Sequence, residues 1–178
     1  MRAMEAPGRL RRANERIVAF QQSRPIALHW GSGAKASADA MSVDTSRHLY
    51  TARLEPRRKG PAMGGYTHYL DSYGLFYDQP VVLNDRQAAA AVHGVHAHNV
   101  AGGEDRIRLS LLAVDTHGYT NAAMAVAKLL GFDLCVRLRN LAERMLYLPP
   151  SIALPEALEP LRTGRVNERK IKNGWDEL

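Results

Sequence analysis

The segment from Leu109 to Asn121 constrains the fold of this chain more than any other. Its apolar run, residues 109–114, ends at Asp115, and a His-Gly turn and Thr120, a helix-capping residue type, follow. This order predicts a buried strand, a turn and a helix. Because ligands bind beyond the carboxyl ends of strands in open α/β sheets, a carboxylate at this position is well placed for chemistry.

A second aspartate, Asp39, lies in an earlier strand-like segment, residues 37–43, far from Asp115 in the sequence. Mg²⁺ takes hard oxygen ligands, usually one or two carboxylates together with substrate phosphate. Asp39 and Asp115 are therefore candidate catalytic residues and candidate Mg²⁺ ligands for phosphoryl transfer, and we expect them to converge in space. A turn or capping role is the alternative for each aspartate.

The composition is that of an ordinary globular protein. Of its 178 residues, 46% are hydrophobic and 24% are charged. This length is sufficient for one domain with a substantial core. No apolar run approaches the roughly 18 to 20 residues of a membrane span, and the first residues lack an apolar signal core. The single cysteine, Cys135, is expected to be a buried thiol. These features predict a cytoplasmic protein.

The net charge of +6 is concentrated in clusters, which would attract DNA or RNA. Solvated loops and helix faces are the alternative. The clusters comprise Arg9, Arg11, Arg12 and Arg16; Arg53, Arg57, Arg58 and Lys59; and Arg162, Arg165, Arg169, Lys170 and Lys172.

The hydrophobic pattern predicts a mixed sheet with helices on its faces. Helices are expected at residues 8–23, at 121–130 with Gly131 just beyond the end, and from a cap at Asn84. A loop is expected at 55–64, and the chain after Pro149-Pro150 is expected to be weakly packed. The predicted strands are residues 37–43, 47–54, 66–70, 75–83, 107–114 and 132–138.

Two further patterns have alternative interpretations. His93, His96 and His98 provide imidazoles that suit Zn²⁺, but their spacing matches no closed structural site, and a helix end with polar histidines is the favoured interpretation. Several aromatic residues could stack on bases, or form core and cross-strand pairs. These are Tyr66, Tyr69, Tyr73, Phe76 and Tyr77.

Several motifs in order resemble the catalytic core of Tn-three family transposases, the DDE enzymes of replicative transposons. The resemblance covers roughly residues 12–178. The matching segments are Trp30-Gly31-x-Gly33 with Ser37-x-Asp39, Tyr66-Thr67-His68 with Asp71, Tyr73 and Phe76, Asp115 to Thr120 with Leu129 to Phe132, Arg137-x-Arg139-Asn140-Leu141 with Leu146-Tyr147, and Trp175-Asp176-Glu177.

The resemblance implies a ribonuclease H-like α/β fold, in which the first aspartate lies on the first strand and the second follows the fourth. It assigns Asp39 and Asp115 to those places, as ligands of Mg²⁺ in a complete enzyme. The implied partners are the transposon ends and target DNA, with no membrane, a homodimer of the full-length protein, and a nucleoid-associated location in a bacterium. The DNA-binding candidates are Arg57, Arg58, Lys59, Arg137 and Arg139.

The chain also departs from the family pattern. Ala40 replaces the glycine after the first aspartate, and the third carboxylate of the family, a glutamate on a late helix, has no counterpart. The expectation is therefore a helical lead-in at 1–25 and a partial catalytic domain at 26–178, incomplete at its C-terminus. Two functions stay open: metal-dependent DNA strand cleavage and transfer in transposition, or a non-catalytic DNA-binding or partner-binding remnant. An unrelated nuclease would need a third acidic ligand within these residues.

Overall fold

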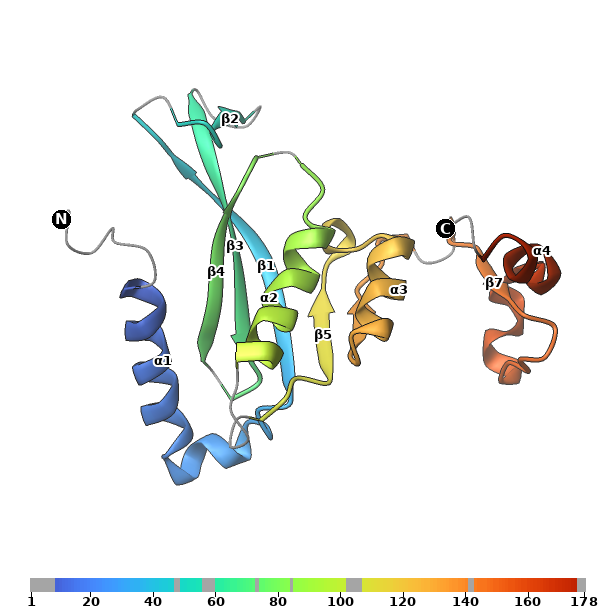
Figure 1. The fold of residues 1–178 in the computed structure, drawn as a ribbon, viewed down its shortest axis with the longest axis horizontal. Helices are drawn as coiled ribbons and strands as arrows, with labels where there is room; N and C mark the ends of the chain where they lie inside the picture. Colours follow the sequence, from blue (N-terminus) through green and yellow to red (C-terminus); the bar gives the residue numbers. More distant parts are fainter. Residues whose placement is uncertain are drawn as a thin grey trace. The chain divides into compact units, whose positions relative to one another are not determined.

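The computed structural model describes residues 9–46, 49–55, 60–72, 74–83, 85–101, 107–140 and 143–175. It contains two compact units, Met1–Arg137 and Leu138–Leu178, and each is described by itself (Figure 1). Within the described residues, none of the helices combines the length and the apolar character that crossing a membrane requires.

The first unit is built on a mixed sheet with β1 at its centre. On one side of β1, β3 and β4 follow as antiparallel neighbours, and on the other side β5 and β6 are parallel to it. The strands are β1 (Lys35–Asp44), β2 (Arg53–Leu54), β3 (Pro61–Leu70), β4 (Leu75–Val81), β5 (Leu111–Val114) and β6 (Asp133–Val136). The order β4-β3-β1-β5-β6 is that of a ribonuclease H-like sheet, which confirms the predicted fold class.

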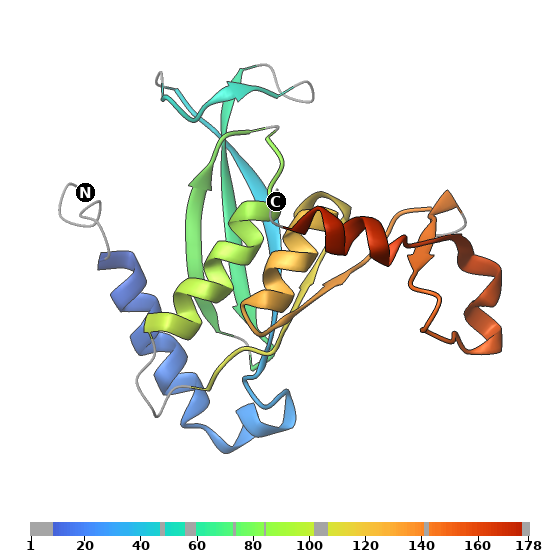
Figure 2. The ribbon, with the colours of Figure 1, turned by 45° about the vertical axis from the view of Figure 1, so that its right-hand side comes forward.

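Two helices, α2 (Ala88–Ala101) and α3 (Asn121–Leu129), cover one face of this sheet, as Figures 1 and 2 show. The predicted cap of α3 is present, because the Thr120 hydroxyl accepts a hydrogen bond from the Ala123 amide at 3.0 Å. Gly131 follows α3 with a φ of +86°, the left-handed conformation predicted for it. The capping residue predicted for α2, Asn84, lies outside the described residues.

A further helix, α1 (Arg9–Gln22), lies beside β4 and is followed by the short helix η1 (Pro25–His29). Among the described side chains of α1, Val18 is buried, and it packs where Gly74, just before β4, leaves room for its methyl groups. Arg9, Arg12 and Arg16 of this helix are exposed. This helix agrees with the prediction for residues 8–23.

The core lies between the sheet and the helices α2 and α3. Alternate residues of β1 and β5 face it, including the buried Ala36, Ala38 and Leu112. The buried side chain of His68 on β3 hydrogen bonds through Nε2 to the Ala91 carbonyl of α2 at 3.0 Å. Burial lowers the pKa of His68, so the imidazole is kept neutral.

The early strands differ from the prediction. Of the described residues 49–54, only those of β2 form a strand, since Leu49 to Ala52 turn sharply and Tyr50 is 90% exposed, with no buried face to hold a longer strand. Residues 47 and 48 of the predicted strand lie outside the described residues. The antiparallel neighbour of β1 is β3. The prediction of a loop at 55–64 was wrong from Pro61 onward, because β3 begins at this residue and Ala62 is buried.

Two predictions near the parallel strands differ from the structure, and the first concerns the strand expected at 107–114, which is present only as β5. Residues 107–110 precede β5 without joining it, and the Asn99 side chain of α2 replaces ladder bonds by pairing with both backbone groups of Leu109. Cys135 is exposed rather than buried. It alternates with the buried Leu134 on β6, so the pleat directs its thiol to the other face of the sheet.

The second unit contains a parallel strand pair that was not predicted. β7 (Leu146–Leu148) pairs with β8 (Arg162–Arg165), and the ring of Tyr147 lies against Gly164. The short helices η4 (Glu156–Leu161) and α4 (Glu168–Asn173) complete this unit, and Asn167 caps α4. Strands of three or four residues give too little alternation for the pattern to be recognised.

The close approach of His68 to α2 generates a prediction. A Cβ at Gly94 would collide with the His68 ring, so Gly94→Ala should lower the free energy of unfolding by about 1–2 kcal/mol through overpacking. This outcome opposes helix propensity, which favours alanine by about 1 kcal/mol.

Urea unfolding of the chain measures this effect. Gly65→Ala is the matched control, since its Cβ would only reach ordinary contact with Met41 at 3.6 Å. A Gly94→Ala variant as stable as the parent chain would show that the helix does not approach the ring this closely.

Candidate active site at the ends of β1 and β5

Asp39 lies midway along β1, on the face of the sheet away from α2 and α3. Its neighbour Ala38 is buried in the core and Asp39 is exposed, as the alternation of a strand requires. The Oδ1 atom of Asp39 accepts a hydrogen bond from the Ala40 amide at 2.7 Å. The carboxylate is thus fixed by its own strand and accessible from outside.

Asp115 is the first residue after β5, as predicted. Its Oδ1 accepts hydrogen bonds from the amides of His117 at 2.9 Å and Gly118 at 3.0 Å, which begins the short helix η2 (Thr116–Gly118). Asp115 therefore has the capping role that the sequence offered as an alternative. The capping hydrogen bonds hold the Asp115 carboxylate at the edge of the sheet, so the capping role is compatible with a role in the candidate site.

The parallel register of β1 and β5 brings the two aspartates together at the level of the backbone. Ala38 lies opposite Val114, so Asp39 and Asp115 are the next residues along adjacent strands. Neighbouring strands are about 4.8 Å apart. The convergence expected from the sequence is therefore present in the strand pairing.

The Tyr66 phenol, on the helix-facing side of the sheet, is influenced by both aspartates. Burial raises the pKa of the Tyr66 phenol, and the negative charges of Asp115 and Asp39 raise it further. Tyr66 stands opposite Ala40 on β3 and is 1% exposed. Both carboxylates thus act on one buried hydroxyl.

The chemistry of this donor set fits a hard divalent cation. Carboxylate oxygens are the ligands that Mg²⁺ and Ca²⁺ prefer. Across the residues that the structure describes, no group of three or more His, Cys, Asp or Glu side chains is arranged to hold a metal ion. The donor set described at this edge is therefore the pair Asp39 and Asp115.

One of the predicted basic residues lies at the same edge. Arg137 follows β6, its amide donates to the Val114 carbonyl at 2.9 Å, and its own carbonyl accepts from the Thr116 hydroxyl at 3.1 Å. These bonds place the exposed Arg137 next to the turn after Asp115. Arg139 belongs to the second unit, and Arg57, Arg58 and Lys59 lie outside the described residues.

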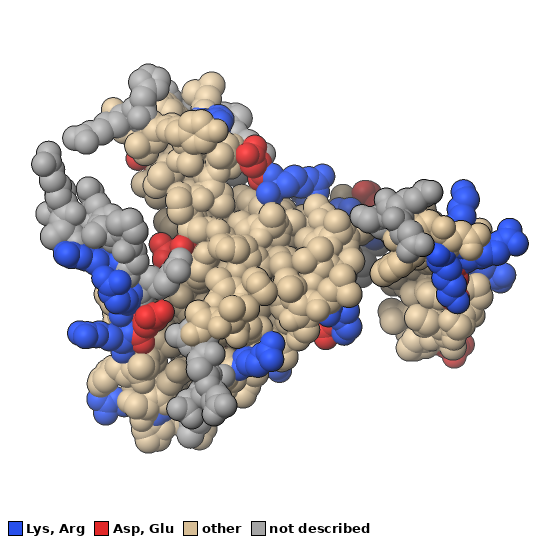
Figure 3. All heavy atoms as spheres, in the orientation of Figure 1, with Lys and Arg blue, Asp and Glu red and all other residues tan. Residues whose placement is uncertain are grey.

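The charges are unevenly spread over the face drawn in Figure 3. Blue side chains gather along α1, whereas the central area over α2 and α3 is largely free of charge. A groove of about 380 Å³ lies between these two helices, lined by apolar residues such as Val92 and Val126 together with His93 and His96.

The three histidines of α2 form no metal site among the residues that the structure describes. His93 contacts the Tyr77 hydroxyl at 3.1 Å and His98 contacts the Ile107 carbonyl at 3.2 Å, whereas His96 lines the groove beside His93. Of the aromatic residues, Tyr66, Phe76 and Tyr77 are buried, in agreement with core packing, whereas Tyr69 is exposed. Tyr73 lies outside the described residues.

The Trp-Gly-x-Gly motif has a structural role that the sequence did not reveal. The Gly33 amide donates to Asp71 Oδ1 at 2.8 Å, and a Cβ at Gly31 would collide with the Asp71 carboxyl group. The Asp71 amide in turn donates to the Lys35 carbonyl at 2.9 Å. This clasp fixes the start of β1, four residues before Asp39 in the chain.

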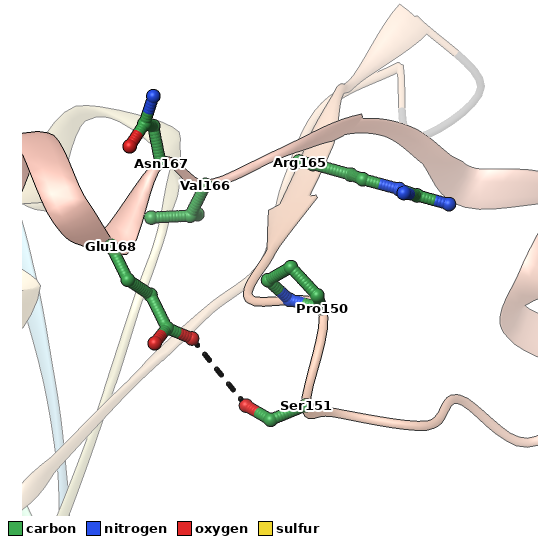
Figure 4. A pocket seen from close by; sticks show the side chains of 6 residues that line it. All are labelled: Pro150, Ser151, Arg165, Val166, Asn167 and Glu168. Carbon is green, nitrogen blue, oxygen red and sulfur yellow. Dashed lines mark hydrogen bonds between the residues drawn. The ribbon is translucent and has the colours of Figure 1, made fainter.

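The second unit has a hollow of its own, of about 540 Å³, shown in Figure 4. It is lined by the segment after β7 and by the residues that join β8 to α4. Its polar contact is between the Ser151 hydroxyl and Glu168 at 3.5 Å. With a single carboxylate, this hollow offers a weaker donor set than the aspartate pair.

Comparison with known proteins identifies the family. The model of the Tn3 transposase DDE domain matches residues 1–178, and the chain belongs to this family. The transposase for insertion sequence element IS1071 in transposon Tn5271 of Comamonas testosteroni is 42% identical over 96% of the chain and 17% of its own length. The transposase for transposon Tn21 of Escherichia coli is 30% identical over 91% of the chain and 16% of its own length.

The chain thus spans about a sixth of the length of these curated relatives. Among solved structures, a pre-cleavage Mos1 transpososome gives a TM-score of 0.40 at 13% identity, covering 94% of this chain and 53% of that one.

The double role of Asp115 generates a prediction. Asp115→Ala removes the acceptor for two backbone amides and should cost about 1 kcal/mol of unfolding free energy, the usual effect of losing a cap. Asp115→Asn keeps an acceptor oxygen and should cost less than half as much. Urea unfolding at neutral pH compares the two variants, and equal losses would argue against the capping geometry.

Proposed function

We propose that this chain is a catalytic part of a DNA transposase, in which Asp39 and Asp115 hold a divalent cation, Mg²⁺, for strand cleavage and transfer. The observation that carries the proposal is the parallel register of β1 and β5, which makes the two aspartates neighbours. Membership of the Tn3 transposase DDE domain family supports the same function.

The two aspartates are held in place in different ways. Asp39 is anchored within a long strand, whereas Asp115 is held by the amides of His117 and Gly118. These hydrogen bonds fix the direction of the Asp115 carboxylate. Two carboxylates oriented in advance can hold a cation without the cost of reordering flexible side chains.

A divalent cation bound at this pair would supply Lewis-acid polarisation of a phosphodiester and a nucleophile of lowered pKa. The open face of the sheet leaves the side of Asp39 accessible to a DNA backbone. Arg137, exposed beside the Asp115 turn, is suited to contact a phosphate, as its planar guanidinium pairs with phosphate oxygens. The neighbouring arginines and lysine at 57–59 are proposed as further phosphate contacts.

A transposition assay in bacteria tests this function, with the complete gene product that contains these residues. Asp39→Asn and Asp115→Asn should each reduce the transposition frequency at least a hundredfold, since each variant keeps the shape but loses a charged ligand. The protein level should be unchanged, because an amide can still accept the backbone bonds.

Asp133→Asn is the matched control. Asp133 begins β6, at the end of the parallel strands remote from the site, and pairs with exposed Lys128 at 2.6 Å, a surface contact of small energetic value. Its variant should transpose within twofold of the parent. Wild-type transposition by either active-site variant would refute the catalytic assignment and favour a non-catalytic DNA-binding role.

A further inference from the structure

The hydroxyl group of Tyr66 is a buried polar atom beside the turn that follows Asp115. Tyr66 lies on the helix-facing side of β3, with its ring at 5.3 Å from that of His68 in an edge-to-face arrangement. Its hydroxyl is shielded from solvent and has no hydrogen-bond partner among the residues that the structure describes. A phenylalanine would fill the same space without burying an unsatisfied donor, whose burial destabilises the folded state.

The position of the hydroxyl is set by the turn that follows Asp115. A Cβ on Gly118 would lie 2.7 Å from the Tyr66 oxygen, so the missing side chain of this glycine makes room for the hydroxyl. Gly118 is also one of the two residues whose amides bind Asp115 Oδ1. The hydroxyl therefore lies against the same turn that orients the Asp115 carboxylate.

We propose that Tyr66 is a positioning residue of the aspartate pair, whose hydroxyl donates a hydrogen bond to the Asp115 carboxylate, directly or through one water, when a divalent cation is bound. The inference rests on the proposed function. Carboxylates that bind metals are commonly hydrogen bonded by an outer layer of residues, and loss of such a partner typically weakens metal binding about 10- to 100-fold. The donor stays available, because the phenol remains protonated throughout the neutral range.

The experiment is a titration of the 178-residue chain with Mn²⁺ alone, followed by the paramagnetic broadening of the backbone amide signals of Ala40 and Gly118. Tyr66→Phe keeps the ring and removes the donor. It should raise the Mn²⁺ concentration for half-maximal broadening about tenfold, with the thermal unfolding midpoint unchanged or higher.

Tyr77→Phe is the matched control. It also removes a buried phenolic hydroxyl from the helix-facing side of the sheet, but that hydroxyl contacts His93 and not the Asp115 turn. Its Mn²⁺ midpoint should stay within twofold of the parent. Gly118→Ala is a second test, since its Cβ would displace the Tyr66 hydroxyl, and it should shift the midpoint in the same direction as Tyr66→Phe.

The outcomes separate this inference from the proposed function. An unchanged midpoint in Tyr66→Phe, or an equal shift in Tyr77→Phe, would overturn the role of Tyr66. If Tyr66→Phe does not fold, an unchanged midpoint in Gly118→Ala would overturn it instead. Asp115→Asn should abolish the broadening of both amides. Persistent broadening in Asp115→Asn would refute the metal site itself. Loss of broadening in Asp115→Asn together with an unchanged Mn²⁺ midpoint in Tyr66→Phe would refute only the positioning role of Tyr66.

Discussion

The parallel pairing of β1 with β5 is the interaction on which the rest of the first unit depends. It joins the antiparallel half of the sheet, β1, β3 and β4, to the parallel half, β5 and β6. Its register is specified because Ala38 and Val114 must both face the core, and a slip of one residue would turn them to solvent. The same register makes Asp39 and Asp115 neighbours, so folding and site assembly share one constraint.

Small residues allow large polar ones to be buried around this pairing. Gly94 accommodates the ring of His68, and Gly118 accommodates the hydroxyl of Tyr66. At the start of β1, Gly31 and Asp71 form the clasp that anchors the strand. These contacts explain why motif residues without direct chemistry occur beside the aspartates: they determine where the strands begin and how closely the helices approach.

Much of the fold and the site could be predicted from local pattern. The strand, aspartate, turn and cap around Asp115 are encoded within a short segment, so their structure was foreseen in detail. The antiparallel partner of β1 was not, because strand pairing depends on residues distant in sequence, and residues 49–54 have no face to bury. The burial predicted for Cys135 was wrong, because a short apolar run does not indicate which face of the strand is covered. Tyr66 was foreseen only as an aromatic residue, because no local pattern signals where its hydroxyl points.

A disulfide between positions 39 and 115 tests most directly whether Asp39 and Asp115 meet across β1 and β5. With Cys135→Ser to remove the native thiol, Asp39→Cys and Asp115→Cys should oxidise to an intrachain disulfide, detected by mass spectrometry of the linked peptides. Disulfides require Cα atoms about 4.4–6.8 Å apart, a spacing that adjacent strands provide. Val43→Cys with Asp115→Cys should not form one, since Val43 lies roughly 13 Å farther along β1. Efficient oxidation of the Val43 pair with none of the Asp39 pair would contradict the register.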